Sequence, residues 1–307
     1  MKKIFLTICI AICALSYSQK KKEIFLFTSF REPATEGLYL AYSEDGYHWK
    51  GLEGSFLKPE IGAGETKIMR DPSITKGADG TYHMVWTTDW KGGNGFGYAS
   101  SKDLIHWSKQ EYIPVMKNEP EVVNVWAPEI FYDDVKKEYI IIWASTIPFR
   151  FAKGVEEEKN NHRMYYVTTK DFKTFSDTKL YFEPGFSVID CVIVKKGKND
   201  YVLVLKDNTR PMRNIKVAFG KSPVGPFEKS SEPLTAYLSE GPTVVKVGKK
   251  WLLYYDNYGS KNYKALSTSD FVHFEDVSSK ISLPEGHKHG TITTISSAVL
   301  KGLIEKK

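Results

Sequence analysis

One pattern recurs five times along the chain and restricts the possible folds more than any other feature. Each copy reads as a strand, a polar turn and a closing aromatic residue. The copies lie at residues 39–49, 97–107, 165–175, 217–227 and 264–274. Aspartate stands at the seventh place in four of the five, and their starts are 58, 68, 52 and 47 residues apart. This spacing suits the blades of a β-propeller, which contain four short strands each.

The strands predicted near the two ends of the chain are complementary parts of one blade. Apolar alternation predicts strands at 23–27 and 37–43 with no inner strand before them, and an inner strand at 289–295 with none after it. Joined, they complete a blade and remove the open sheet edges that invite aggregation. We therefore expect an all-β fold, a five-bladed β-propeller whose last blade is closed by N- and C-terminal strands.

The first eighteen residues have the composition of a secretory signal peptide. A lysine pair precedes an apolar run at 4–15, and Ser16 and Ser18 are small enough for a signal peptidase. A bilayer span needs roughly 20 apolar residues, more than this run supplies. We expect 1–18 to be a cleaved signal and 19–307 to be a single catalytic propeller, exported to the periplasm or the extracellular space, without a membrane span.

Charge and cysteine content narrow the range of partners. The formal net charge is +6, and the lysines are scattered rather than gathered on one basic face, which argues against a nucleic-acid partner. Only Cys191 of the three cysteines lies outside the expected signal, so the domain has no intrachain disulfide and depends on its apolar core. We expect a monomer.

Propeller geometry selects candidate functional residues. The first residues of inner strands and the last residues of second strands share one face, because adjacent strands are antiparallel. The residues at these places are Asp71, Trp126, Glu129, Asp190, Glu240 and His289 on inner strands, and Asp89, Trp90, Lys206 and Asp256 on second strands. Each carboxylate alone could be a turn residue or a hydrogen-bonded core residue. Asp71, Asp190 and Glu240 are expected at equivalent places of three strands, and this favours a shared pocket.

A pocket of carboxylates and aromatic rings suits the hydrolysis of a glycosidic bond. One carboxylic acid protonates the leaving oxygen, and one carboxylate accepts a proton from water. A separation of about 5–5.5 Å gives retention of configuration, whereas about 6.5–9.5 Å gives inversion. A third carboxylate nearby can raise the pKa of the acid through like-charge repulsion.

Four motifs resemble those of glycoside hydrolase family 43, over residues 25–297. They are Arg-Asp-Pro-Ser-Ile at 70–74, Trp-Ala-Pro-Glu-Ile at 126–130, Val-Ile-Asp at 188–190 and Ser-Glu-Gly-Pro at 239–242. The resemblance implies an inverting enzyme with Asp71 as general base, Glu240 as general acid and Asp190 as the residue that tunes and orients the acid. No Asn-Asp-Pro motif of the related retaining fructosidases occurs.

The resemblance also bears on His289 and on cofactors. His289 is similar to the axial histidine of the family, which in some members contacts calcium through water; a hydrogen-bonded core histidine is the alternative. We expect no required cofactor, with a structural calcium on the axis as an option. Trp126 and Trp90 are expected to stack against sugar rings, although Trp90 could equally pack between blades. Glu129, Asp89, Lys206 and His289 complete the expected substrate pocket.

The family acts mainly on α-L-arabinofuranosides and β-D-xylosides, and some members act on galactan or galactofuranose. Many of its xylosidases carry a C-terminal β-sandwich, and we expect no such domain in this sequence. We therefore expect an exo-α-L-arabinofuranosidase whose substrate is an oligo- or polysaccharide with plant or algal side chains. A β-D-xylosidase or a galactan- or galactofuranose-directed hydrolase is the alternative within the family. A non-catalytic glycan-binding propeller is the alternative from another class.

Overall fold

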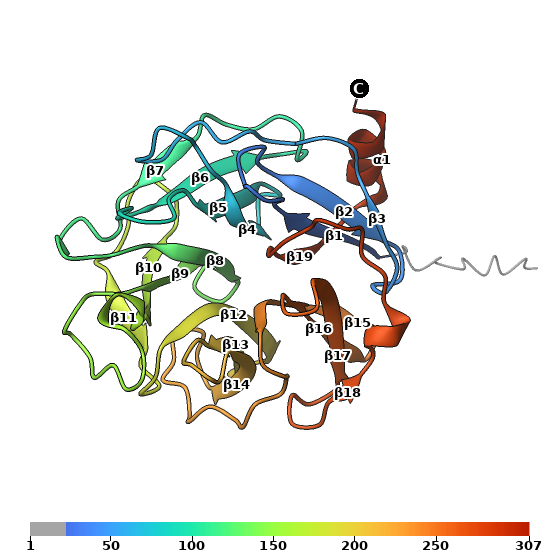
Figure 1. The fold of residues 1–307 in the computed structure, drawn as a ribbon. Helices are drawn as coiled ribbons and strands as arrows, with labels where there is room; N and C mark the ends of the chain where they lie inside the picture. The colour runs from blue at the N-terminus through green and yellow to red at the C-terminus, as the bar shows by residue number, and fades with distance from the viewer. Residues whose placement is uncertain (1–22, 307) are drawn as a thin grey trace, which may run out of the picture.

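Five antiparallel sheets stand in a ring around a central axis (Figure 1). The structure is a computed structural model that describes residues 23–306. The arrangement confirms the predicted five-bladed β-propeller. The expected signal at 1–18 lies outside the described residues. Within those residues, neither the helix nor the short helical turns have the length and hydrophobicity that crossing a bilayer requires.

Four of the five blades are built from consecutive strands that follow chain order outward from the axis. The first contains β4 (Arg70–Lys76), β5 (Tyr82–Thr87), β6 (Phe96–Ser101) and β7 (Glu111–Ile113). The next two contain β8 (Trp126–Asp133), β9 (Glu138–Ser145), β10 (Arg163–Thr169) and β11 (Lys179–Phe182), and then β12 (Val188–Gly197), β13 (Asp200–Asp207) and β14 (Asn214–Gly220). The fourth contains β15 (Ser239–Val247), β16 (Lys250–Asn257), β17 (Asn262–Thr268) and β18 (Glu275–Asp276). Short 3-10 turns lie at Glu158–Asn160 and Ser278–Lys280.

The fifth blade joins the two ends of the domain, as predicted. Its innermost strand is β19 (Ile292–Ile295), which pairs antiparallel with β1 (Ile24–Ser29). Next come β2 (Tyr39–Ser43) and β3 (Trp49–Gly51). The ring is thus held shut by backbone hydrogen bonds between strands more than 260 residues apart in sequence.

The repeated aspartate forms the turn that ends the third strand in four of the five blades. Asp103 accepts hydrogen bonds from the backbone N–H groups of Ile105 and His106, at 2.9 and 2.8 Å. The Ser101 hydroxyl accepts the N–H of Leu104 at 2.8 Å. Leu104 is fully buried and has a left-handed φ of 67°, a strained conformation that the surrounding hydrogen bonds and packing stabilise. In three of the blades the turn therefore places a buried side chain in the core, namely Leu104, Phe172 and Phe271.

The apolar core consists of five clusters, one at each junction between neighbouring blades. Trp86 and Trp143 are fully buried in two of them. Cys191 is buried in a third and has no disulfide partner within residues 23–306. Burial of a large apolar side chain contributes about 1.5–3 kcal/mol, so these junctions hold the blades together without covalent links.

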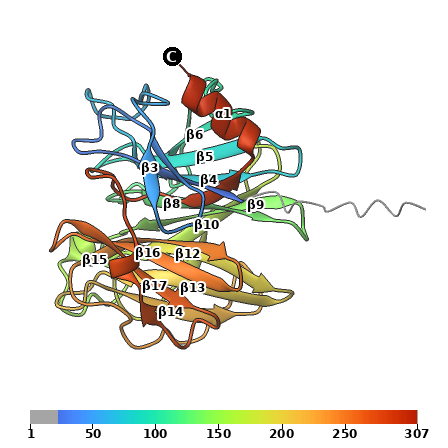
Figure 2. The same ribbon diagram turned by 90° about the vertical axis from the view of Figure 1, so that its right-hand side faces the viewer.

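A C-terminal helix that the repeat does not predict follows the ring. Helix α1 (Ser297–Glu305) begins at Ser296, whose hydroxyl oxygen accepts a hydrogen bond from the N–H of Val299. Its buried Leu300 and Leu303 join the cluster between the β1–β3 and β4–β7 blades. The helix lies on the outside of the ring, next to the closing blade (Figure 1 and Figure 2).

This packing predicts the effect of truncating α1. Leu303→Ala leaves a cavity in that cluster and should lower the free energy of unfolding by about 2–5 kcal/mol. Ile304→Ala is the matched control, because Ile304 is 53% exposed, and it should change the value by about 0.5 kcal/mol or less. Urea denaturation measures both. Equal losses in the two variants would show that α1 does not secure the junction.

Candidate active site

Four inner strands begin with the same backbone irregularity, which directs their first side chains. Asp71, Ala127, Asp190 and Gly241 have left-handed φ angles of 50°, 45°, 52° and 53°. The pairing with the second strand shifts register at each of these positions. A bulge of this kind bends the strand and re-aims a side chain.

The bulges correct one expectation about register. Asp71 and Asp190 occupy equivalent positions, but the residue equivalent to them in β15 is Gly241. Glu240 lies one residue earlier, in the place that Arg70 takes in β4. A Cβ atom on Gly241 would lie 2.5 Å from the ring of His289, so glycine is needed here to leave room for that ring.

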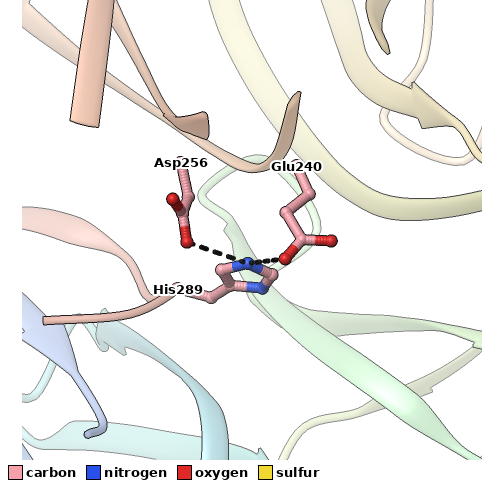
Figure 3. A group of neighbouring side chains, drawn as sticks. All are labelled: Glu240, Asp256 and His289. Carbon is pink, nitrogen blue, oxygen red and sulfur yellow. Dashed lines mark ion pairs between the residues drawn. The ribbon is translucent and has the colours of Figure 1, made fainter. Parts of the chain in front are cut away.

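His289 lies at the centre of the site, between two of the expected catalytic carboxylates. Its Nδ1 atom is 3.2 Å from an oxygen of Asp71, and its Nε2 atom is 3.1 Å from an oxygen of Glu240. An oxygen of Asp256 lies 4.0 Å from the same Nε2 atom (Figure 3). The side chain of His289 is only 12% exposed. The closing segment before β19 therefore brings a single imidazole into the middle of the carboxylate cluster.

The remaining contacts fix each carboxylate separately. Lys206, buried in β13, donates to the second oxygen of Glu240 at 2.7 Å. The Thr87 hydroxyl donates to Asp71 at 2.8 Å and accepts the N–H of Ala127 at 2.8 Å. Asp190 accepts the N–H of Gly241 at 3.0 Å.

These contacts set the pKa values of the ionised pair and the histidine. Burial raises the pKa of Asp71 and of Glu240, but His289 outweighs it at both, together with Arg70 at Asp71 and Lys206 at Glu240, so both pKa values lie below the usual range. Burial lowers the pKa of His289, yet the carboxylates around it raise that pKa well above 6.5. Asp71 and Glu240 are therefore ionised and His289 is protonated at neutral pH.

The other two titrating groups of the cluster behave differently. Burial raises the pKa of Asp190, and the charges of His289 and Lys206 offset this only in part. Burial lowers the pKa of Lys206, but Glu240 and Asp190 raise it above its ordinary value. Asp190 is thus the carboxyl of the three most disposed to retain a proton.

Glu129 of β8 is bonded to β4 and to the segment before β19. It accepts hydrogen bonds from the hydroxyls of Ser73 and Thr291, at 2.5 and 3.2 Å. It lines a cavity of about 30 Å³ that Asp71, Asp190 and His289 also line, large enough for a water molecule but not for a sugar. Burial raises the pKa of Glu129 to about 7.

The expected calcium contact of His289 finds no free ring nitrogen. Among the described residues, Glu240, Asp256 and His289 offer ligand atoms within 4.8 Å of one another. Both nitrogens of His289 are paired with carboxylates, and Asp256 is paired with Lys288 at 2.7 Å. Calcium takes six to eight oxygen ligands, so water would have to supply most of them, and the contact through water stays a prediction.

Stacked rings form one wall beside the cluster. The rings of Trp90 and Trp126 are stacked with centroids 4.8 Å apart, and Trp126 also stacks on His162 at 4.9 Å. The guanidinium of Arg70 lies 4.9 Å from the centroid of Trp90, which is 52% exposed. Both expected tryptophans therefore meet on this wall, and the exposed face belongs to Trp90.

Asp89 has a different position from the other expected pocket residues. It is buried, and its carboxylate accepts the N–H groups of Ala63 and Gly64 at 2.7 and 3.1 Å. A third hydrogen bond comes from the hydroxyl of Thr88. These bonds anchor the loop before β4, so Asp89 shapes the surroundings of the site rather than its floor.

Sequence reasoning missed two residues of the site and gave a third no role. Thr87 ends β5 and His162 precedes β10, and neither position was singled out. Asp256 was expected on this face but was given no role. It lies opposite Glu240 in the β15–β16 ladder. That ladder position was the available signal, whereas nothing in the sequence around His162 marks it.

Comparison with known families decides the class of the protein. Residues 21–300 match the model of the glycosyl hydrolase 43-related family, described as "Probable glycosyl hydrolase domain". The chain belongs to this family. Residues 21–300 therefore form a domain of the glycosyl hydrolase type, which confirms the resemblance seen in the motifs.

Individual relatives are distant. An α-L-arabinofuranosidase of Bifidobacterium longum subsp. longum is 23% identical over 197 residues, which cover 57% of this chain and 18% of that protein. The chain thus spans less than a fifth of that relative. Among solved structures, an α-L-arabinofuranosidase of Lactobacillus brevis has 19% identity and a TM-score of 0.53, covering 68% of this chain and 72% of its own. The catalytic domain of the GH62 α-L-arabinofuranosidase of Coprinopsis cinerea has 13% identity and a TM-score of 0.56, with 86% and 79% covered. At these identities the two structures share the fold.

The raised pKa of Glu129 predicts how stability depends on pH. Its pKa is about 7 in the folded protein against an ordinary 4.5, so the folded state binds the extra proton between these values. The contribution of Glu129 to the free energy of unfolding is complete below pH 4.5, and it falls by about 3 kcal/mol as the pH rises to 7. Glu129→Gln keeps both hydrogen-bond partners and removes this slope.

Urea denaturation at pH 5, 6 and 7.5 measures this slope in wild type and variant. Between pH 5 and pH 7.5, the free energy of unfolding of Glu129→Gln should fall by less than that of the wild type. Glu121→Gln, at an exposed position, is the control and should follow the wild type. Identical slopes in Glu129→Gln and wild type would refute the assignment.

Proposed function

We propose that this glycoside hydrolase is an inverting exo-α-L-arabinofuranosidase acting on side chains of plant or algal polysaccharides. Asp71 serves as general base, Glu240 as general acid, and Asp190 orients and tunes the acid. The observation that carries the proposal is the placement of Asp71 and Glu240 on opposite nitrogens of His289.

The separation of the two carboxylates favours inversion. An N···O distance near 3 Å on each side of one imidazole ring puts their oxygen atoms roughly 8 Å apart. Inverting glycosidases need about 6.5–9.5 Å, which leaves room for the attacking water, whereas retaining enzymes need only about 5–5.5 Å. The geometry supports a single displacement in which Asp71 takes the proton of that water.

The charge state of Asp71 suits a general base. Its pKa lies below the usual range because His289, Arg70 and Thr87 stabilise the carboxylate more than burial disfavours it. It is therefore ionised over the whole neutral range and ready to accept a proton. The bond from Thr87 fixes one oxygen, which leaves the carboxylate in one orientation.

Glu240 must gain a proton before it can act as an acid. In the free protein His289 and Lys206 hold it ionised. Its side chain is 25% exposed, whereas those of Lys206 and Asp256 are 3% and 2% exposed. A bound sugar covers this open side and removes water from the carboxylate, which raises the pKa of Glu240. The proton then passes from Nε2 of His289 to Glu240, and from Glu240 to the leaving oxygen.

Asp190 acts on the acid through its neighbour. Its carboxyl holds the N–H of Gly241, the residue that follows Glu240, and so fixes the backbone that carries the acid. Its partial negative charge opposes the two cations and favours protonation of Glu240. Trp90, supported by the stacked ring of Trp126, provides the ring face against which a furanose packs. The arabinofuranosidase of Bifidobacterium longum supports the choice of sugar; export, a single catalytic domain and a monomeric state remain predictions.

Hydrolysis of aryl glycosides tests the proposal. Wild type should release 4-nitrophenol from the α-L-arabinofuranoside faster than from the β-D-xyloside or the β-D-galactofuranoside. Asp71→Asn and Glu240→Gln should each lower kcat by about 10²–10⁴-fold, since each removes a proton-transfer group. Retained activity in both variants would overturn the roles. Preference for another glycoside would move the substrate to the xylosidase or galactan-directed alternative, and glycan binding without hydrolysis would favour the non-catalytic one.

The pH dependence of kcat/KM tests the place of His289. The acidic limb reports the ionisation of Asp71 in the free enzyme. His289→Gln removes the cation that lowers the pKa of Asp71, so the limb should move to higher pH. His273→Gln, whose exposed ring bonds Asp270 in a blade turn, is the control. An acidic limb that stays in place in His289→Gln would show that this histidine does not set the charge of the base.

A further inference from the structure

A second cavity opens on the same face as the active site, among the loops of the β4–β7 blade. Its volume is about 630 Å³, within the range of about 300–1,000 Å³ that ligand sites occupy. We call it the loop cleft; its walls are parts of segments 60–67, 92–94 and 117–122, with Tyr112 of β7. These segments lead into β4, out of β5 and into β8, so the cleft borders the starts of two inner strands.

The walls of the loop cleft are tied to one another. Asp89 holds the N–H groups of Ala63 and Gly64. The Tyr112 hydroxyl donates to the side-chain oxygen of Asn94 at 2.9 Å and accepts its N–H at 3.0 Å. A preformed site of this kind loses little conformational entropy when a ligand binds.

The loop cleft lies next to the stacked rings of the active site. Gly92 lines it and follows Trp90 by two residues, and the N–H of Gly92 donates to the carbonyl of Val123 at 3.0 Å. The carbonyl of Trp90 accepts the indole N–H of Trp126 at 3.0 Å. Trp90 therefore connects the loop that lines the cleft with Trp126 on the wall of the active site, and its side chain is 52% exposed.

The lining of the loop cleft suits an uncharged ligand rich in hydroxyls. Ile61, Tyr112, Pro120 and Val122 supply apolar surface, and Asn94 supplies an amide. The lining contains two glutamates and two lysines, whose formal charges cancel. Apolar faces with a few polar groups are what sugar rings require.

One lysine and one glutamate of the lining are already engaged. Lys67 donates to the carbonyls of Gly62 and Gly64, both at 2.7 Å. Glu119 accepts two hydrogen bonds from Arg150, both at 2.7 Å. The lining therefore has no cluster of positive charges that would favour an acidic glycan.

We propose that the loop cleft binds the main chain of an uncharged polysaccharide whose side-chain sugar enters the active site. Trp90 then contacts the sugar at the branch point, and the cleft holds the main-chain units beyond it. This assignment of a second sugar-binding site rests on the proposed function for its carbohydrate chemistry. A ligand site in the cleft also gives a reason why Asp89 fixes the loop before β4 and does not join the catalytic cluster.

A filled cleft separates this proposal from the chemistry of the active site. Ala63 is exposed and lines the cleft, and its side chain makes no hydrogen bond, so Ala63→Trp fills the space without removing a contact. Thr66→Trp, on the same loop and outside the lining, is the matched control. The ratio of kcat/KM on arabinan or arabinoxylan to kcat/KM on the 4-nitrophenyl arabinofuranoside should fall about tenfold in Ala63→Trp and stay unchanged in Thr66→Trp. An unchanged ratio in Ala63→Trp would overturn the proposal.

Binding without turnover keeps the test independent of the proposed function. Electrophoresis through gels that contain arabinan, arabinoxylan, β-1,3-galactan or polygalacturonate measures retardation of Asp71→Asn with and without Ala63→Trp. At least one uncharged polymer should retard the single variant and not the double variant, even if no aryl glycoside is hydrolysed. The proposal would be overturned if the uncharged polymers retarded both variants equally or retarded neither. Retardation by polygalacturonate alone would also overturn it.

Discussion

Three carboxylates can crowd the axis of this propeller only because two cations lie among them. Asp71, Asp190 and Glu240 would repel one another in a partly buried site, and an unpaired buried charge is strongly destabilising. His289 and Lys206 lie between and beside them and balance most of this charge. The cluster is therefore a single electrostatic unit, in which the protonation of each member depends on the others.

This unit makes ring closure a functional requirement as well as a structural one. His289 stands just before β19, the strand that completes the fifth blade. The neighbouring Thr291 donates its backbone N–H to the hydroxyl of Thr28 of β1 and its hydroxyl proton to Glu129 of β8. The backbone N–H of Ile292 donates to Thr243 of β15. Bonds to three other strands thus fix the position of the histidine, and a loosened closing strand would displace the central cation.

The repeat predicted the blades and the closure because both follow from local alternation and from the spacing of turns. It could not predict the bulges, since Asp71, Ala127 and Asp190 adopt left-handed φ angles without the glycine that would mark them. Helix α1 has no counterpart in a blade, so the repeat gives no signal for it. The low pKa of Glu240 was equally hidden, because its causes, Lys206 and His289, come from two other blades. The sequence placed Asp71, Glu240 and His289 on one face, and only the fold showed that the two carboxylates contact opposite nitrogens of the histidine.

The residues at the propeller axis and the loops of the β4–β7 blade are held in place by different interactions. Residues at the axis come from all five blades and are constrained by charge balance, so a change in one of them alters the others. The loops of the β4–β7 blade are held by Asp89 and Tyr112, which make no ion pair with the cluster among the described residues. Trp90 is the point where the two regions meet, since it stacks on Trp126 and carries the chain toward Gly92. Recognition of the sugar surroundings can therefore vary through the loops while the proton-transfer chemistry at the axis stays fixed.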